Sequence, residues 1–391
     1  MTNTTMLLRR RFLCRLALAV AVAVVLALAV SVFRAAAVSC PRRALSHVAD
    51  PGIWRGAYHV HTRMSPDASG TIAEVAAAAR ASGDTWVLIT DHNQKDPAGA
   101  RYIDGVLFVF ATEVSTAEGH VTAPGVSRAL TDAEREHDPL GAIQRLGGAP
   151  VAAHPLNRRR PYTRLDDQRL AGLEVLSLDT LFRQALVSPY DLLRIGPSYV
   201  VNAEYAALQL LERPDPALGR WDTLLARQRM SGFCALDAHG RPAYRAEMRA
   251  LAMYAMVGRA RTDDAAADGQ ALVRALVQGR SFCGIDGQAD AGGFRFTADT
   301  EGGQVAMGDE VALARQPILR IDLGYDRGPS QVHPHLICGG TETALTEVAV
   351  PVGRRYAYRP TRAAACRAEV WFEDGAGRAV PWILSNPIYI R

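Results

Sequence analysis

Short apolar or extended runs bounded by polar or turn residues recur through the first part of the chain. Five of them stand out: 54–61, 85–90, 106–111, 150–153 and 232–236. Runs of this length are typical of buried parallel strands. Helix-like stretches, three of which end at glycine, lie between or after them: 72–82, 138–146, 217–229 and 271–278. This alternation predicts an α/β fold with a parallel sheet or barrel.

The pattern changes beyond about residue 293. The segments 294–297, 318–323 and 368–373 mix apolar with polar or charged residues, partly in alternation, and glycine-rich turns such as Asp374–Gly377 separate such segments. This pattern predicts a small antiparallel β-sandwich. His333 and His335 lie in this region without a further ligand-type partner, and we expect them at the surface.

The N-terminus has a pattern of its own. Residues 16–33 are apolar except for Ser31, and four arginines precede them. Eighteen such residues can just span a bilayer, and the preceding arginines favour a cytoplasmic N-terminus. The prediction is a single-pass protein of a bacterial inner membrane with its catalytic part in the periplasm or exterior. The alternative is a secreted protein or lipoprotein after cleavage near residues 37–40, where small residues precede Cys40.

These patterns divide the chain into four parts. We expect a signal anchor or signal peptide over 1–40, a linker over 41–50, a catalytic domain over 51–290 and a β-rich domain over 291–391. The net charge of +4 is mild for 391 residues. A basic stripe with interleaved aromatic residues is absent from the sequence, so a nucleic acid polymer is not indicated as a partner.

The cysteines are compatible with export. None of the six cysteines forms a CxxC zinc pattern. Cys234 lies in a predicted core strand, where we expect it to behave as a small hydrophobic residue. Cys338 and Cys366 lie in the same C-terminal region and could pair in an oxidising compartment.

Candidate chemistry follows the predicted strands. An ordered series of imidazoles and carboxylates stands mostly at or just after their ends: His59, His61, Asp67, Asp91, His92, Glu113, His120, His154, Asp237 and His239. Such a ligand set suits Zn, Mn or Fe rather than Ca or Mg. The carboxyl ends of parallel strands meet at one edge. Ten candidate ligands exceed the need of one tetrahedral ion, so the series predicts two or three divalent transition metal ions and a hydrolytic reaction.

Each of these residues alone has an ordinary structural explanation. Two histidines two apart on a strand could be a buried hydrogen-bonded pair, and Asp67 could cap a helix or belong to a turn. Asp91 could orient an imidazole instead of binding a cation, and we favour that role. The order of the whole set makes chance an unlikely explanation.

The order and spacing of the series resemble the PHP (polymerase and histidinol phosphatase) superfamily. The phrases 54–62, 89–93, 119–122 and 385–390 look most like its carbaryl-hydrolase-like branch. The resemblance is strong over roughly residues 50–290. It implies a distorted (β/α)7 barrel with a metal site at its mouth.

The resemblance also implies a distribution of ligands. The first ion would take His59, His61, Glu113 and Asp237. Glu113 would bridge to a second ion held by His120 and His154. A third ion, which some members lack, would take Asp67, His92 and His239. His137 is a rival to His120, but it lies in a charged stretch that looks like surface.

Two shared cations would lower the pKa of a water molecule and yield a hydroxide for hydrolysis. Asp67, Asp91 or His239 could supply a proton to the leaving group. Arg158, Arg159, Arg160 and Tyr162 follow His154 closely and could bind an anionic small-molecule ester. Phosphoester hydrolysis by a phosphatase or phosphodiesterase is the first expectation. Hydrolysis of a carbamate or carboxylic ester, or a non-catalytic envelope-associated binding scaffold, are the alternatives.

Overall fold

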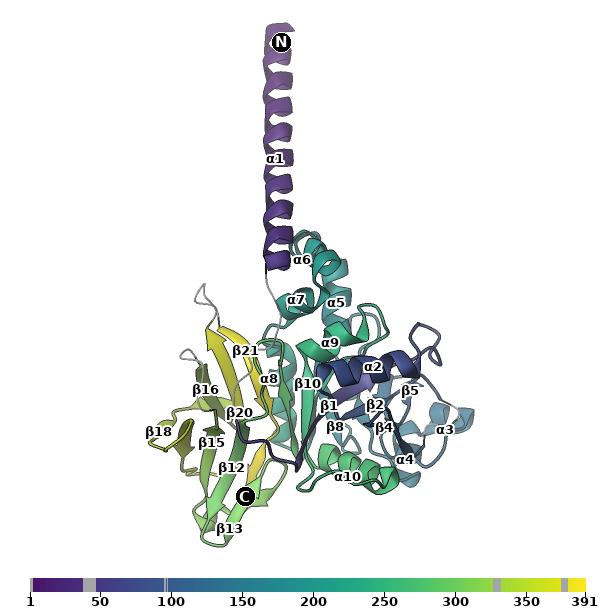
Figure 1. The fold of residues 1–391 in the computed structure, drawn as a ribbon, viewed down its shortest axis with the longest axis vertical. Coiled ribbons are helices and arrows are strands. Elements are labelled where there is room, and N and C mark those ends of the chain that lie inside the picture. The colour runs from purple at the N-terminus through teal and green to yellow at the C-terminus, as the bar shows by residue number, and fades with distance from the viewer. Residues whose placement is uncertain (1–2, 38–46, 95, 97, 326–331, 374–378) are drawn as a thin grey trace.

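The protein is a mixed α/β body with one long helix projecting from it (Figure 1). The computed structural model describes residues 3–37, 47–94, 96, 98–325, 332–373 and 379–391. Residues 38–40 of the expected cleavage region, residues 41–46 of the expected linker and the Asp374–Gly377 turn lie outside the described residues.

Three sheets organise the described strands. The largest runs in spatial order through β14 (Glu310–Val311), β22 (Ile388–Ile390), β20 (Ala364–Glu373), β21 (Ala379–Ser385), β11 (Ser281–Gly284), β10 (Ala252–Met256), β1 (Ile53–Val60), β2 (Trp86–Ile89), β4 (Val106–Phe110) and β3 (Ala100–Ile103), while β16 (Val332–Cys338) pairs with β20 and with β17 (Thr341–Thr343). The second is β5 (Glu113–Thr116), β6 (Gly119–Thr122), β7 (Val151–Ala152), β8 (Gly172–Ser177) and β9 (Ser231–Ala235). The third is β13 (Gly303–Ala306), β12 (Phe294–Thr300), β15 (Ile318–Leu323), β19 (Arg354–Tyr358) and β18 (Thr346–Val348).

Ten α-helices and a short 3₁₀ helix, Leu313–Arg315, are described. The α-helices are α1 (Asn3–Ala37), α2 (Ile72–Ser82), α3 (Asp132–His137), α4 (Pro139–Arg145), α5 (Leu178–Leu186), α6 (Pro189–Val201), α7 (Ala203–Leu210), α8 (Asp215–Leu225), α9 (Tyr244–Ala250) and α10 (Ala265–Val277). The four predicted helices correspond to α2, α4, α8 and α10. The α8 helix ends four residues before the predicted end, and α10 begins six residues before the predicted start.

Helix α2 shows why its prediction succeeded. Thr71 and Glu74 form a reciprocal capping box at its start, and Gly83 ends it with φ +75°. The left-handed conformation at the C-terminal stop suits glycine because it has no Cβ. The helix buries Val75 and the alanines on the same side against the core. Local signals and packing therefore agree over this segment.

The strands that carry the candidate ligands are parallel only in part. Strands β1, β2 and β4 pair in parallel, as do β7, β8 and β9. Strand β6 is antiparallel to both β5 and β7, and β10 is antiparallel to β1. Isolated bridges His92↔Glu113 and Val60↔Ala238 join the first and second sheets. The two sheets consequently meet at two places, and both places are beside candidate ligands.

The predicted C-terminal strands form the third sheet and also extend the first one. Strand β11 pairs with β21, so the largest sheet continues from the ligand-bearing region into the C-terminal region. A second apolar core, which includes Phe294, Ile321, Val370 and Trp382, joins strands of both sheets. The antiparallel pairing expected here is present in β12–β15–β19 and β16–β20–β21. The division at residue 290 stays a prediction.

A buried charge network ties helices to this C-terminal part. Arg213 donates to Glu369 at 2.8 Å, and Arg367 donates to Asp222 at 2.8 Å. Arg367 and Glu369 are both almost fully buried. Burial raises the pKa of Glu369, but hydrogen bonds from Arg213 and the charge of Arg367 outweigh that effect and hold the pKa below its usual value of 4.5. Glu369 is therefore a buried anion with two cationic partners.

Two disulfides are present among the described residues. Cys338 and Cys366 face each other across the β16–β20 pair and are bonded, as the sequence suggested. Cys234 is also bonded, to Cys283. The expectation that Cys234 is only a small buried hydrophobic residue is thus wrong. Strands β9 and β11 bring the two Cα atoms within 5.9 Å, although the residues are 49 apart in sequence.

The N-terminal helix α1 contains a stretch, Arg9–Ala37, that is long and apolar enough to cross a membrane. A signal sequence near the N-terminus can also be this long and apolar. Its last turns lie beside α6 (Figure 1). Ser31 Oγ donates to the Arg194 carbonyl at 3.1 Å, and Asn202 donates to the Ala35 carbonyl at 3.2 Å.

Candidate metal centre

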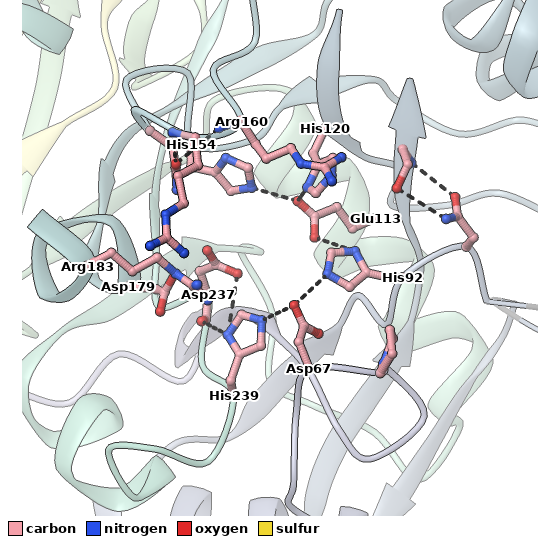
Figure 2. A pocket seen from close by; sticks show the side chains of 15 residues that line it. Asp67, His92, Glu113, His120, His154, Arg160, Asp179, Arg183, Asp237 and His239 are labelled. Carbon is pink, nitrogen blue, oxygen red and sulfur yellow. Dashed lines mark hydrogen bonds and ion pairs between the residues drawn. The ribbon is translucent and has the colours of Figure 1, made fainter. Parts of the chain in front are cut away.

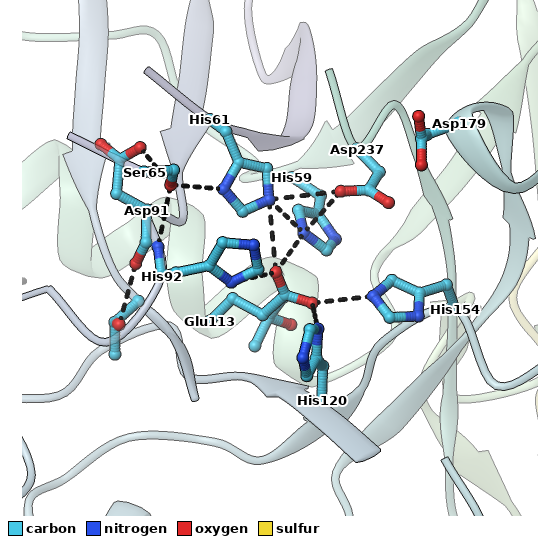
Figure 3. Close-up of polar contacts among 12 residues, drawn as sticks. His59, His61, Ser65, Asp91, His92, Glu113, His120, His154, Asp179 and Asp237 are labelled. Carbon is cyan, nitrogen blue, oxygen red and sulfur yellow. Dashed lines mark hydrogen bonds and ion pairs between the residues drawn. The ribbon is translucent and has the colours of Figure 1, made fainter. Parts of the chain in front are cut away.

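The ligand-bearing segments converge on one buried cluster (Figure 3). His59 lies in β1 and His61 directly follows β1, while Asp237 follows β9. Glu113 begins β5, and His120 lies in the antiparallel strand β6. His92 and His154 follow β2 and β7 respectively. The strand ends predicted from the sequence therefore meet in space. His120 is the exception, since it lies within β6 and not at the end of a strand.

Glu113 is at the centre of the cluster (Figure 3). Its side chain is fully buried. Its Oε1 lies 3.0 Å from His120 Nδ1 and 2.9 Å from His154 Nε2. Its Oε2 lies 3.1–3.4 Å from nitrogens of three other imidazoles, those of His59, His61 and His92. Each carboxylate oxygen thus faces a different set of imidazoles, which is the arrangement required of a bridging ligand.

The buried polar atoms of the cluster support a cation site. In the part of the chain that the structure describes, Glu113 Oε2 and His92 Nδ1 make no hydrogen bond of acceptable geometry. His59 Nε2 and His61 Nε2 lie only 3.0 Å apart. Buried polar groups normally have partners, and two imidazole lone pairs that face each other require a proton or a cation between them. The residues present fit a metal site.

Three overlapping groups have ligand atoms close enough to surround one ion, within 4.8 Å of one another. The first is His59, His61, Glu113 and Asp237, the set expected for the first ion. The second is His92, Glu113 and His120, and the third is His61, His92 and His239. The second and third groups differ from the expected sets, because His92 lies between them and also contacts Asp67.

His154 and Asp67 lie beside these groups. His154 reaches Glu113 Oε1, as described above. Asp67 Oδ2 lies 3.3 Å from His92 Nε2 and 3.4 Å from His239 Nε2. The Asp67 side chain is 46 % exposed. Hydrogen bonds with His239 and His92 hold the pKa of Asp67 well below its usual value. Asp67 is therefore a carboxylate at the open side of the cluster.

The electrostatics of the cluster favour positive charge among its imidazoles. Burial lowers the pKa of His61 and of His154, but nearby carboxylates outweigh it and raise each pKa to about 9. The pKa of His59 is raised well above its usual value for the same reason. Burial raises the pKa of Glu113 and of Asp237, but the surrounding imidazoles hold both below their usual values. Either protons or metal cations can supply this positive charge.

Glu174 positions two of the histidines, and no sequence pattern pointed to this residue. It lies in β8 and is almost fully buried. Its Oε1 lies 2.6 Å from His59 Nδ1, and its Oε2 accepts a hydrogen bond from the His154 backbone N–H at 2.7 Å. A partner of this kind fixes the ring orientation of a metal-binding histidine and raises its basicity.

Asp91 has a similar supporting position (Figure 3). It accepts hydrogen bonds from the Thr62 N–H at 2.6 Å and from Ser65 Oγ at 2.8 Å. Ser65 Oγ in turn lies 2.9 Å from His61 Nδ1. The carboxylate contacts Thr62 and Ser65, and it does not line the open pocket. Its geometry favours the orienting role over proton transfer to a substrate.

Three of the cluster residues have unusual backbone conformations. The φ angles of His59, His154 and Asp237 are +64°, +29° and +53°. Non-glycine residues with positive φ are uncommon and gather at functional sites. The pairing of β1 with β2 is also irregular between Ala57 and Val60. The backbone is thus adapted to bring these side chains together.

An open pocket of about 460 Å³ lies over the cluster (Figure 2). Residues of the cluster form its floor, and Pro66 is the only apolar residue among its described lining residues. Arg159 and Arg160 line it, as the sequence suggested, but Arg158 and Tyr162 do not. Tyr162 is buried, which raises its pKa to about 12. Substrate contact expected for these last two residues is therefore not supported by their positions.

The pocket has further lining residues that the sequence did not reveal. Asp179 and Arg183 come from α5 and form an ion pair with each other (Figure 2). Burial and the nearby Asp237 carboxylate raise the pKa of Asp179. Asn93, Ser115 and Asn157 also line the pocket. A short amphipathic helix with one aspartate and one arginine carries no sequence signal for this role.

The remaining histidines lie outside the cluster. His137 is exposed on α3, so it is not the rival to His120 that the sequence left open. His335 pairs with Glu342 at 2.6 Å, and His333 is exposed near Glu373. Both were expected at the surface. This is confirmed for His333 and holds only in part for His335, which is partly buried.

No protein-family model matches the chain, and no curated protein matches it. What the protein does must therefore be inferred from the side chains of the site.

Proposed function

We propose that this protein is a metal-dependent hydrolase of small anionic esters, and that phosphoesters are its substrates. The observation that carries the proposal is the position of Glu113, whose two oxygens face two sets of imidazoles beneath an open polar pocket. The overlapping ligand groups support two or three ions, of which zinc, manganese and iron suit imidazole and carboxylate ligands.

When bound, such ions activate a water molecule and neutralise charge on the substrate. The residues of the chain hold the ligands and orient the substrate. Glu174 fixes the ring of His59, and Asp91 fixes that of His61 through Ser65. Asp67 and His239 both line the pocket. Because Asp67 is held as a carboxylate, His239 is the better placed of the two to give a proton to the leaving group.

The pocket wall favours a phosphoester over a carbamate or carboxylic ester. A neutral carbamate would be bound best by an apolar or aromatic wall, whereas every described lining residue here except Pro66 has a polar or charged side chain. The guanidinium groups of Arg159 and Arg160 form no ion pair with any described residue. Two cations without acidic partners beside a pocket suit a phosphate group, whose oxygens accept hydrogen bonds from arginine.

The same reasoning extends to family, fold and location. We propose that residues 51–290 form a PHP-type distorted (β/α)7 barrel, which the meeting of the first and second sheets beside the ligands supports. We also propose that α1 stays attached as a single membrane span, with the catalytic part in the periplasm or exterior. The two disulfides support that location, because disulfides persist in oxidising compartments.

The test is elemental analysis of the full chain in detergent, followed by assays on bis-p-nitrophenyl phosphate, p-nitrophenyl phosphate and 1-naphthyl carbamate. Chelation should abolish hydrolysis of the phosphate esters, and the added metal should restore it. Glu113→Ala should remove both the ions and the activity, because one carboxylate contacts both ligand sets. Glu118→Ala, in the turn of the same β5–β6 hairpin, is the matched control. It should keep both its ions and its activity.

The outcomes separate the candidate functions. Activity on the carbamate alone would replace the phosphoester assignment by the second one. A chain that holds ions but hydrolyses none of the three esters would favour the binding scaffold. Normal turnover by Glu113→Ala would show that the cluster is not the reaction centre.

A further inference from the structure

Exposed apolar side chains are concentrated in one segment at the foot of α1, from the end of α5 to the end of α6. We call this set the α6 surface, and its members are Leu186, Val187, Tyr190, Leu192, Leu193, Tyr199, Val200 and Val201. Val200 is 84 % exposed and Tyr190 is 72 % exposed. Outside α1 the described residues include only five other exposed large apolar side chains, and these are scattered.

Such a concentration needs an explanation. Soluble monomers rarely expose contiguous apolar surface of this kind, and larger patches mark sites of interaction with proteins or membranes. The charges within the segment do not oppose burial in a less polar medium, because Asp191 and Arg194 pair with each other at 3.2 Å. Tyr190 and Tyr199 are of the residue type that is enriched at membrane interfaces.

The position of the α6 surface beside α1 points to a lipid bilayer as its partner. The last turns of α1 lie against α6, with Ser31 bonded to the Arg194 carbonyl and Asn202 bonded to the Ala35 carbonyl (Figure 1). The apolar run of α1 ends at Phe33. Ser31 is two residues before that end, which corresponds to about 3 Å along a helix. A bilayer that surrounds the apolar run would therefore reach the level of α6.

We propose that the α6 surface lies in the interface of the bilayer that α1 crosses, with its apolar side chains at the boundary between headgroups and acyl chains. An amphipathic element in such a position typically sinks about 5–10 Å into that boundary. This inference rests on the proposal that α1 remains attached as a membrane span. It adds a second point of attachment, which would prevent the body from swinging freely about its tether.

Helix α5 connects this attachment to the candidate metal centre. Its residues Asp179 and Arg183 line the pocket, and its last residue, Leu186, belongs to the α6 surface. The distance from Asp179 to Leu186 along the helix is about 10 Å at 1.5 Å per residue. Immersion of the α6 surface would therefore fix the height of the pocket above the membrane.

The experiment measures depth in the membrane at single positions of the full chain. Val200→Cys, and in a second sample Tyr190→Cys, is made in a background with Cys14→Ser and Cys40→Ser. Each protein is labelled with a nitroxide and reconstituted into phosphatidylcholine–phosphatidylglycerol vesicles. Electron paramagnetic resonance then compares collisions with oxygen, which is enriched in lipid, with collisions with a water-soluble nickel chelate.

Two further positions serve as references. Val352, which is 59 % exposed in the C-terminal part, is the matched control in water, and Val25 reports on the middle of α1. We expect positions 200 and 190 to favour oxygen over nickel several-fold relative to position 352. We expect position 25 to be the deepest.

Every outcome decides between the two proposals. If position 25 is deep but positions 190 and 200 match position 352, the α6 surface faces water and the inference is wrong while the membrane span stands. If positions 190 and 200 are shielded from both reagents, protein and not lipid covers the surface, and the inference is also wrong. If position 25 is not deep, both the span and the inference fall.

Discussion

Replacement of Glu174 by glutamine is the sharpest test of how the cluster is held together. Gln has nearly the same volume as Glu, but it has one oxygen and one NH₂ group in place of two oxygens. The two Glu174 oxygens lie 2.6 Å from His59 Nδ1 and 2.7 Å from the His154 backbone nitrogen, and both of these face them as donors. Whichever way the amide turns, one of the two donors must therefore face the NH₂ group.

The expected magnitude follows from that mismatch. A buried donor left without an acceptor costs about 1–3 kcal/mol. Loss of a partner that orients a metal-binding histidine typically weakens metal affinity about 10–100-fold, and each tenfold change corresponds to about 1.4 kcal/mol. Glu174→Gln should therefore bind its ions about 10–100-fold more weakly, whereas Glu113→Ala should lose ions outright.

The assay is competition with a chelator at fixed pH, with zinc or manganese retained by the protein measured after equilibration, and with thermal unfolding recorded in parallel. Glu369→Gln is the matched control, because Glu369 is equally buried but outside the cluster. It should lower stability and leave metal affinity unchanged. If Glu174→Gln keeps its metal affinity within about twofold of the unaltered protein, Glu174 does not orient His59, and the account of the cluster is refuted.

Three other changes have defined outcomes. Arg160→Ala should lower kcat/KM for a phosphate ester about 10-fold or more, since a hydrogen bond to a charged group contributes about 1.5–3 kcal/mol, and Arg158→Ala, outside the pocket lining, should leave it unchanged. The pKa of Glu369 is lowered in the folded state, so its stabilising contribution should be complete above pH 4.5 and disappear as the pH falls below it. The free energy of unfolding, measured from pH 3 to 7, should fall at low pH in the unaltered protein. In Glu369→Gln the part of this fall that comes from Glu369 should be missing. Cys338→Ser should lower the free energy of unfolding by about 3–4 kcal/mol, because Cys338 and Cys366 are 28 residues apart in sequence and close a loop in the unfolded chain; equal stability of the serine variant under oxidising conditions would contradict this.

The residues of the first candidate ligand set could be found from the sequence because each follows or lies in an apolar strand. His59, His61, Glu113 and Asp237 form a compact group as expected. The grouping of the others was less predictable. His92 lies between two groups because its two ring nitrogens face different acids, Glu113 and Asp67. Sequence order cannot specify which face of a ring meets which carboxylate.

The fold was predictable where local signals agree with packing, and not where pairing is long-range. The capping box and terminal glycine define α2 by themselves. Strand β6, by contrast, is antiparallel to both neighbours, a pairing that its four residues do not encode locally. Glu174 looks like an ordinary polar residue in a strand, and its role appears only when β8 pairs with β7 and the Glu174 side chain reaches His59 of β1. The Cys234–Cys283 bond likewise depends on tertiary neighbours.

That bond would link the redox state of the protein to the readiness of the candidate metal centre. Cys234 lies in β9, only three residues before Asp237, and its partner anchors this strand to β11. If the catalytic part lies outside the cytosol, as proposed above, the bond would be missing in the reducing cytosol and would form only after export. There the bond would secure the strand that delivers Asp237, and the site would become ready for its ions only on the side of the membrane proposed for the catalytic part.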